Sequence, residues 1–576
     1  MNQNYSKMLS YNFHQNTVSK IISAESGTIA TVIDSIIISK FLGLDAMGAY
    51  GIAVPVVYLV IALAKLFSDG GARQCGISIG KADRKHSDSV YSTSIISSML
   101  MAFAIMIIIL TAPKWVARLL GANGAAEYYL NGAAEFLRGY AWGIPGYVLL
   151  LTLIPFAQLD GKISSVSVAG YSMAVVDVLL DIANVFVFRY GLFGMALATS
   201  VSEYVGAIIL CVALFRKNSE FHFSLRLFDP RLIFRLRWDG TPGFFSYFYT
   251  TIRSVVANYT IAAFLPIWIL PIYSGVSSLM NLFYPIGKGI GSTVMIFSSL
   301  FYGEEDKSSM KQVLSLSNIY SIVINFVLTV ILIVFAPYLL RIFLTLPAEE
   351  MALAAHGARL MALSLIPFSL HTIFRSYLQG IGRIVHTILF LGIYECIIST
   401  LSVYALSALH EVEGFWISFI VREILALMLA FIFILIMNKR NQNQLSARNL
   451  EFLIFDKFGI NENESFEGSV YHVSDLNEFT KNAEKTLCTA DDSIKTLTVY
   501  INNIGNSVFS RQFPSKQIPE LRIRIYKKDG MWELHFRDNG DRFDPTEQET
   551  FDGFNAKYIR SMNQNVLTLQ QNNPTI

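Results

Sequence analysis

Long apolar runs, separated by short polar segments, fill the first 440 positions of this 576-residue chain. A helix that crosses a lipid bilayer needs about 20 mostly apolar residues. The pattern therefore predicts an all-α, polytopic membrane protein with twelve transmembrane helices in this part. The predicted helices are 18–42, 47–68, 89–112, 136–158, 164–188, 193–215, 243–265, 268–292, 313–337, 352–377, 385–409 and 414–438.

The pattern changes after position 440. Residues 476–487 and 493–509 are spaced as amphipathic helices are, and residues 521–528 and 531–538 alternate as paired strands do. Asp529-Gly530 between those strands is a typical hairpin turn. The order helix, helix, strand, strand predicts a small α+β domain over residues 441–576.

The charges support this division. Lys, Arg, Asp and Glu make up about 12% of residues 1–440 but about 25% of residues 441–576, the usual share in a soluble domain. The net charges are about +6 and about −4, so they indicate no nucleic-acid partner. The composition also excludes disordered and fibrous classes. Four scattered cysteines fit neither a disulfide framework nor a zinc site, and we expect no metal centre.

Basic residues in the short loops predict the orientation. With both termini in the cytoplasm, the inner loops hold about fourteen Lys and Arg and the outer loops about five. This positive-inside bias places the tail in the cytoplasm. The first apolar run is too long for the core of a cleaved signal peptide, so we expect no cleaved leader.

The basic stretch 216–239 divides the twelve helices into six and six. Residues 32–42 (VIDSIIISKFL) resemble residues 256–265 (VANYTIAAFL), and Pro145 and Pro367 occupy similar places in the two halves. We therefore expect two six-helix bundles, 1–217 and 218–440. They should be related by an axis along the membrane normal, with a binding site between them.

Ionisable residues inside predicted spans are costly and usually face a cavity or a partner. Either a structural ion pair or a binding site explains any one of them. Asp177 and Asp181 are four residues apart, hence on one helix face. The ionisable residues inside predicted spans are Asp34, Asp177, Asp181, Glu203, Arg253, Arg359, Glu395, Arg422 and Glu423.

Three of these acids, Asp34, Asp177 and Asp181, fall in the first half with no basic residue predicted at their depth. Neighbouring carboxylates in a low dielectric cannot all ionise. A group that must bind a proton or a cation is what a coupled transporter needs. In the second half, Arg253, Glu395, Arg422 and Glu423 are either paired structural charges or cavity-lining residues.

Several segments resemble one known family. They are residues 32–55 with Asp34, the Gly-rich helix end and basic loop 68–90, DVLLD (177–181), GMALATSVSE (194–203) with Thr199, and LQGIGR (378–383). Together they resemble the MATE (multidrug and toxic compound extrusion) transporters of the MOP flippase superfamily over roughly residues 15–438.

This resemblance implies a secondary antiporter in a prokaryotic plasma membrane. It would export organic small molecules against inward H⁺ or Na⁺ and need no cofactor. Asp34, Asp177, Asp181 and Thr199 would then form the proton or cation site. Asp177 replaces an Asn of the family. Thr250, Leu370 and His371 stand where some members carry acids, which argues against a cation site in the second half.

The order of helices and strands in the tail, together with DNGDRFDP (538–545), resembles the GHKL ATP-binding fold in its anti-sigma-factor-kinase form. That resemblance implies that Asp538 and Gly540 would contact the nucleotide and Asn506 a Mg²⁺ ion. Asn502 replaces the catalytic Glu, so we expect no kinase or ATPase activity. Alternatively, residues 538–540 are merely a turn.

ATP is not expected to drive transport. The segment GKGIGST (287–293) lacks the P-loop pattern, and we interpret it as a packing or hinge cluster of glycines.

Two other functions stay open. A flippase for a lipid-linked precursor would use basic residues to hold a pyrophosphate, and Arg253, Arg359 and Arg422 are candidates. A membrane sensor would instead pass a ligand signal through the degenerate tail to a cytosolic protein partner. The favoured hypothesis is a cation-coupled exporter with a regulatory tail.

Overall fold

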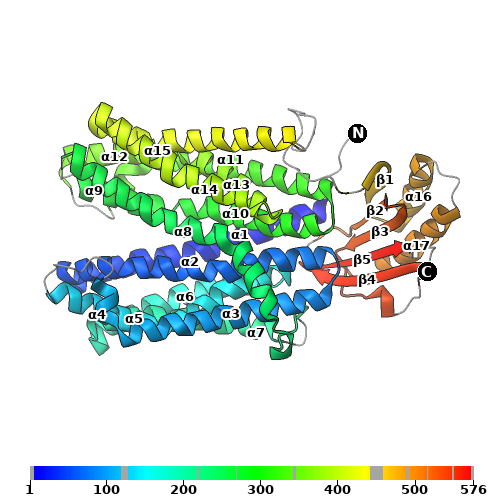
Figure 1. The fold of residues 1–576 in the computed structure, drawn as a ribbon, viewed down its shortest axis with the longest axis horizontal. Helices are drawn as coiled ribbons and strands as arrows, with labels where there is room; N and C mark the ends of the chain where they lie inside the picture. Colours follow the sequence, from blue (N-terminus) through cyan, green and yellow to red (C-terminus); the bar gives the residue numbers. More distant parts are fainter. Residues whose placement is uncertain are drawn as a thin grey trace.

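The computed structural model contains a long helical body with a sheet domain at one end (Figure 1). It describes the chain except for residues 1–5, 119–126, 217–218, 267–268, 342–345, 441–457, 459, 488–491, 515–516, 548–550 and 572–576. The predicted boundaries at 217/218 and 440/441 fall at or beside segments outside the described residues. The division of the helical body into two six-helix bundles stays a prediction.

We call helices α1–α7 the first lobe. Within this lobe, α5 packs on α7 and α2, and α6 packs on α7 and α1. The elements are α1 (Lys7–Ile37) continued by η1 (Ile38–Leu42), α2 (Leu44–Gly80), α3 (Arg84–Thr111), α4 (Pro113–Ala117), α5 (Glu127–Leu159), α6 (Ile163–Ala183) continued by η3 (Asn184–Phe188), and α7 (Gly191–Leu214).

We call helices α8–α15 the second lobe, which follows the short helix η4 (Leu225–Leu227). In Figure 1 the helices from α9 to α15 form a second layer beside α2–α7. The elements are α8 (Pro230–Phe264), α9 (Ile269–Asn281), α10 (Tyr284–Gly303), α11 (Lys307–Leu340), α12 (Ala348–Ala362), α13 (Leu365–Gly380), α14 (Ile384–Gly392), η5 (Ile393–Ile398) and α15 (Ser399–Arg440).

The number of membrane spans differs from the sequence-based expectation. Helices occur at all twelve predicted places, but length and composition mark eight stretches of the described residues as candidate spans. Two predicted helices are interrupted, at 282–283 and at 363–364, and α15 is kinked at His410 and Glu411. A count of twelve therefore stays a prediction, while a multi-pass helical membrane fold is established.

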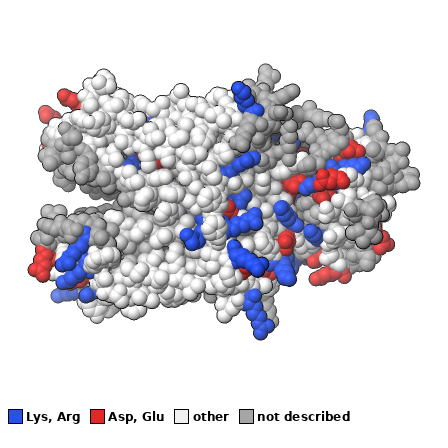
Figure 2. Space-filling view, in the orientation of Figure 1, with Lys and Arg blue, Asp and Glu red and all other residues white. Residues whose placement is uncertain are grey.

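The surface of the helical body is suited to lipid. Ile319, Val323 and Phe326, on one face of α11, are each more than half exposed. Figure 2 shows a broad band with very few charged side chains, while most Lys, Arg, Asp and Glu gather toward the two ends. Water-soluble monomers rarely expose apolar surface on this scale, so the band is the membrane-facing surface.

The sheet domain has five antiparallel strands in the order β1-β2-β3-β5-β4, and helices α16 and α17 pack on its core. The elements are β1 (Ile460–Val470), α16 (Val473–Leu487), α17 (Asp492–Phe509), β2 (Leu521–Lys528), β3 (Met531–Asp538), η7 (Pro545–Glu547), β4 (Phe554–Ser561) and β5 (Gln564–Gln571).

The predicted hairpin is confirmed at residues 521–528 and 531–538, because Asp529 and Gly530 both adopt the positive φ that its turn requires. The sequence analysis missed the other three strands. The predicted α+β character of the tail is nevertheless correct.

The two lobes touch at the end of the body that carries the sheet domain. Gly70 on α2 lies against the backbone carbonyl of Leu236 on α8, where a methyl group would overlap it. Beside this contact, Arg73 on α2 forms an ion pair of 2.7 Å with Asp239 on α8. Close backbone approach of this kind requires glycine, so the structure is closed at this end.

Candidate functional site

The first lobe brings together the three acids that the sequence singled out. Asp34 on α1 is 8% exposed, while Asp177 and Asp181 on α6 are 1% and 0% exposed. Asp34 interacts electrostatically with both of the others. Neither carboxylate oxygen of Asp181 has a hydrogen-bond donor among the described residues. The i, i+4 spacing on α6 and the packing of α1 on α6 produce this convergence.

Helix α7 supplies the rest of this group. The Ser202 hydroxyl donates to Asp177 Oδ1 at 3.1 Å, and Thr199 also acts as a hydrogen-bonding neighbour of Asp177. Glu203, 4% exposed, is a fourth carboxylate and interacts electrostatically with Asp177. We call Asp34, Asp177, Asp181 and Glu203 the acid cluster. Ser202 was missed, because a serine in an apolar helix gives no distinctive signal.

The second lobe pairs its predicted charges. Arg253 Nη1 on α8 lies 2.8 Å from Glu395 Oε2 on η5, and Arg422 Nε lies 2.9 Å from Glu423 Oε1 on α15. Glu423 also contacts His371 Nε2 at 2.7 Å and accepts a hydrogen bond from the Tyr394 hydroxyl. All four predicted charges are therefore paired. Three of them, Arg253, Glu395 and Arg422, also line a pocket.

Two further cations, Lys288 on α10 and Arg375 on α13, line the same pocket, which has a cavity volume of about 50 Å³. The sequence analysis missed both, since Lys288 lies in the glycine segment 287–293 and Arg375 near the end of an interrupted span. A basic residue within an apolar run was the available signal. Arg359 lies elsewhere: it is exposed and donates to the carbonyl of Ile333.

Some of the tail residues predicted to bind a nucleotide form hydrogen bonds within the protein. Asp538 Oδ1 accepts hydrogen bonds from Asn565 and from the Gly540 amide, both at 2.9 Å. Burial raises the pKa of the Asp538 carboxyl, while Arg511 acts in the opposite direction. Asn506 is exposed on α17. Nucleotide binding through Asn506, Asp538 and Gly540 stays a prediction.

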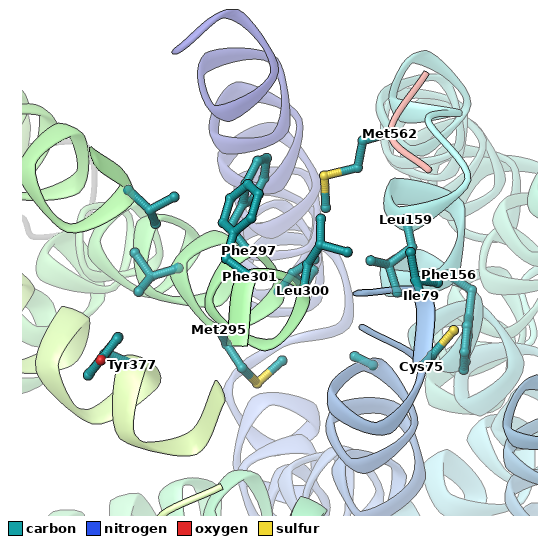
Figure 3. Packing of buried hydrophobic residues seen from close by; sticks show 14 of the residues in the cluster. Cys75, Ile79, Phe156, Leu159, Met295, Phe297, Leu300, Phe301, Tyr377 and Met562 are labelled. Carbon is teal, nitrogen blue, oxygen red and sulfur yellow. The ribbon is translucent and has the colours of Figure 1, made fainter. Parts of the chain in front are cut away.

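The sheet domain contacts the first lobe through its β4–β5 turn. The Met562 amide and the Ser561 hydroxyl donate to the Leu159 carbonyl at 2.8 and 2.9 Å. Asn563 Nδ2 donates to the Gly161 carbonyl at 2.9 Å. Figure 3 shows Met562 among buried side chains that include Leu159 and Phe297, so one turn reaches residues of both lobes.

A second set of contacts joins the sheet to the turn between α10 and α11 in the second lobe. Arg524 donates to the carbonyls of Glu304 and Glu305, both at 3.1 Å, and Arg537 forms an ion pair with Glu304. Burial alone would raise the pKa of Asp306, but Arg524 and Arg522 hold it below its ordinary value. The sheet is thus anchored to both lobes.

The described part of the chain contains no group of three His, Cys, Asp or Glu placed to hold a metal ion. Cys75, Cys211 and Cys396 are free thiols, and Cys488 lies outside the described residues.

Sequence comparison places the helical body in a known group of transporters. The profile of the MatE family matches residues 26–170 and 242–404, just over half of the chain. The multidrug export protein MepA of Staphylococcus haemolyticus is 26% identical over 247 residues, which are 41% of this chain and 53% of that protein. MepA of Staphylococcus aureus is 27% identical over 199 residues, 34% and 43% of the two chains. The chain spans about half the length of these relatives.

Solved structures share the fold. An outward-facing multidrug resistance MATE transporter of the MOP superfamily matches with a TM-score of 0.69 and 19% identity, over 75% of this chain and 98% of that one. A MOP superfamily transporter from Pyrococcus furiosus gives the same four values. The share of this chain that is covered leaves room for the sheet domain as an addition to the common fold.

Proposed function

The chain belongs to the MatE family of secondary transporters, and from this premise we propose that it is a cation-coupled antiporter that exports organic compounds by alternating access. The first-lobe acid cluster takes up H⁺ or Na⁺ from outside, and the lobes rock to release substrate outward and the ion inward. Transport draws on the ion gradient and not on ATP.

The observation that supports ion coupling is the convergence of Asp34, Asp177 and Asp181 in a buried site. Like charges this close in a low dielectric are unfavourable unless a proton or a metal cation is shared among them. Among the described residues, the hydrogen-bonding neighbour of Asp181 is another acid, Asp34, so these two carboxyl groups are placed to share a proton or a cation. Binding and release of that ion changes the electrostatic free energy of α1 against α6, which biases the lobe arrangement.

Replacement of Asp34 by Asn tests the proposal. In liposomes with an imposed H⁺ or Na⁺ gradient, we expect wild-type protein to move at least one of two organic probes, cationic rhodamine 6G or anionic phenyl phosphate. We expect the D34N variant to lose gradient-driven transport of that probe at least about a hundredfold. A matched amide change at Glu411, exposed at the α15 kink, should leave transport unchanged. Wild-type transport by D34N would contradict the coupling role of the cluster.

We also propose that the sheet domain regulates this cycle from the cytoplasm. Exposed Lys and Arg gather where the helical body meets the sheet domain (Figure 2), as the positive-inside rule requires of a cytoplasmic face. Since one sheet is anchored to both lobes at this face, its contacts stabilise the arrangement closed to the cytoplasm. Inward opening then requires that at least one set of contacts is released.

Gly161→Ala tests the regulatory role. Gly161 has φ of +76°, and a methyl group there would press on the backbone and side chain of Asn563. We expect the variant to weaken docking by about 1–2 kcal/mol, with faster hydrogen exchange in β4–β5 and a changed transport rate. Gly191→Ala is the matched control, because Gly191 has φ of +57° and open space around it. An unchanged transport rate with increased exchange would contradict regulation by this contact.

A further inference from the structure

The pocket of the second lobe has the lining of a ligand site. Its cavity volume is about 50 Å³, below the range of about 300–1,000 Å³ of sites that enclose a whole small molecule, so it admits one polar end of an organic ligand. The aromatic rings of Tyr284, Phe368 and Tyr394 line it together with polar groups. Apolar walls with a few converging polar groups are the usual composition of a ligand site.

The charges of this pocket do not balance. Among its described lining residues, Arg253, Lys288, Arg375 and Arg422 face one carboxylate, Glu395. Glu423 behind the wall pairs with Arg422. Two of the four cations therefore have a carboxylate partner, and two positive charges remain.

The two remaining cations are Lys288 and Arg375. Arg375 Nη1 donates to the Ser246 hydroxyl at 2.9 Å, and Lys288 Nζ lies 5.4 Å from the centre of the Tyr247 ring. Neither forms an ion pair with an acid in the described part of the chain. Lys288 lies within electrostatic range of three cations, Arg253, Arg375 and Lys65, and of one carboxylate, Glu395, which also acts on Arg375.

An excess of positive charge at membrane depth costs free energy that a bound anion would recover. Uncompensated cations are not needed to hold the second lobe together, since the Arg253–Glu395 pair already joins α8 to η5, and Glu423 on α15 already contacts His371 on α13. A purely structural role thus explains Arg253 and Arg422 but leaves Lys288 and Arg375 without a reason.

We infer that this pocket binds the substrate of the transporter and that the substrate is an organic molecule with an oxyanion group, a phosphate or a carboxylate. Arg375 and Lys288 hold the oxygens, because a guanidinium fork and an ammonium group are the donors that match them. The apolar part of the substrate packs on Tyr284 and Phe368. This inference rests on the proposed transport function and names its substrate class.

The two lobes then bind groups of opposite charge. The acid cluster of the first lobe attracts a small cation, and the pocket of the second lobe attracts an anion. A cationic drug would be repelled by Lys288 and Arg375. The oxyanion can belong to a membrane lipid or to a soluble metabolite, and both share the recognised chemistry.

Binding to the full-length protein in detergent tests the inference with two probes, phenyl phosphate as a soluble oxyanion and dihexanoyl phosphatidic acid as a lipid one. We expect wild-type binding and a loss of about 10- to 100-fold in the K288Q/R375Q double variant. The charge-preserving R375K variant should retain most of the affinity. R359Q is the matched control, since Arg359 is a second-lobe arginine outside the pocket.

Binding of both probes supports oxyanion recognition from either source, and binding of the phosphatidic acid alone identifies a lipid substrate. Binding of neither, equal binding by K288Q/R375Q, or tighter binding of rhodamine 6G in the same pocket overturns the inference. Loss of transport in D34N with intact phenyl phosphate binding supports both proposals. Gradient-driven transport of rhodamine 6G with no oxyanion binding would leave the antiporter proposal standing and remove only the substrate class.

Discussion

The two lobes treat buried charge in opposite ways. In the first lobe, Asp34, Asp177 and Asp181 converge with no basic residue beside them in the described structure, and the hydrogen-bonding neighbour of Asp181 is another acid, Asp34. In the second lobe, Glu395 and Glu423 are each bonded to an arginine. A paired acid contributes to stability only while its partner remains, whereas an unpaired acid costs stability and is retained for another reason. The difference separates structural acids from acids available to an ion.

The largest expected effect on the free energy of unfolding is at the paired acid Glu423. Glu423→Gln removes the charge that Arg422, His371 and Tyr394 surround, and leaves Arg422 buried without a full counter-charge. We expect the free energy of unfolding in detergent to fall by about 3–5 kcal/mol, measured by denaturant titration. Glu413→Gln, at an exposed acid that contacts His356, should change it by less than about 1 kcal/mol. Equal stability of E423Q and wild type would remove the contrast between the lobes.

A paired acid outside the membrane-spanning part provides an intermediate case. Asp306 accepts hydrogen bonds from the Ser309 amide and hydroxyl at 2.9 and 2.7 Å, and its pKa is held low by Arg524 and Arg522 despite burial. Because the folded-state pKa lies below the unfolded value of about 4, the stabilisation is present above that pH and is lost as pH falls. We expect D306N to be less stable by about 1–2 kcal/mol at pH 6 to 7.

The measurement is the difference in melting temperature between wild type and D306N across pH 3 to 7. The difference should shrink steadily below about pH 4, where Asp306 in the unfolded chain becomes protonated. A difference that grows as the pH falls would show that the sign assigned to this carboxylate is wrong.

The smallest effect on stability is expected at the unpaired acid Asp181. Asp181→Asn replaces a buried carboxylate that has no donor with a neutral group of similar shape. We expect the melting temperature to stay the same or to rise, by no more than about 1 kcal/mol of unfolding free energy, while coupled transport is lost. Loss of stability as large as that of E423Q would mean that Asp181 is structural.

Much of the fold could be predicted from local patterns. The apolar runs located the helices, but α1, α2, α5, α8 and α10 each extend about ten residues beyond a predicted end. The alternation around Asp529-Gly530 gave β2 and β3 with their observed bounds. The breaks at 282–283 and 363–364 were not predicted, because both halves of each interrupted helix remain apolar. β4 and β5 were missed because their exposed positions depend on what the sheet packs against.

The residues of the candidate sites were also predicted only in part. The i, i+4 spacing of Asp177 and Asp181 is sufficient by itself to predict that they share one face of α6, and Asp34 joins them as expected. Lys288 and Arg375 were missed, because their significance depends on the pairing of Arg253 and Arg422, which no local pattern records. Arg359 was a candidate only by its position in an apolar run, and it lies outside the pocket.

The sequence by itself determined that the chain is a helical membrane protein with a separate α+β tail, because hydrophobic length and periodicity are properties of consecutive residues. Only the tertiary structure decided which charges are neutralised and that one sheet is anchored to both lobes. Those outcomes depend on distances between residues hundreds of positions apart, such as Met562 and Leu159. Electrostatic energy in a low dielectric depends on those distances, which place a group of unpaired acids in one lobe and a basic pocket in the other.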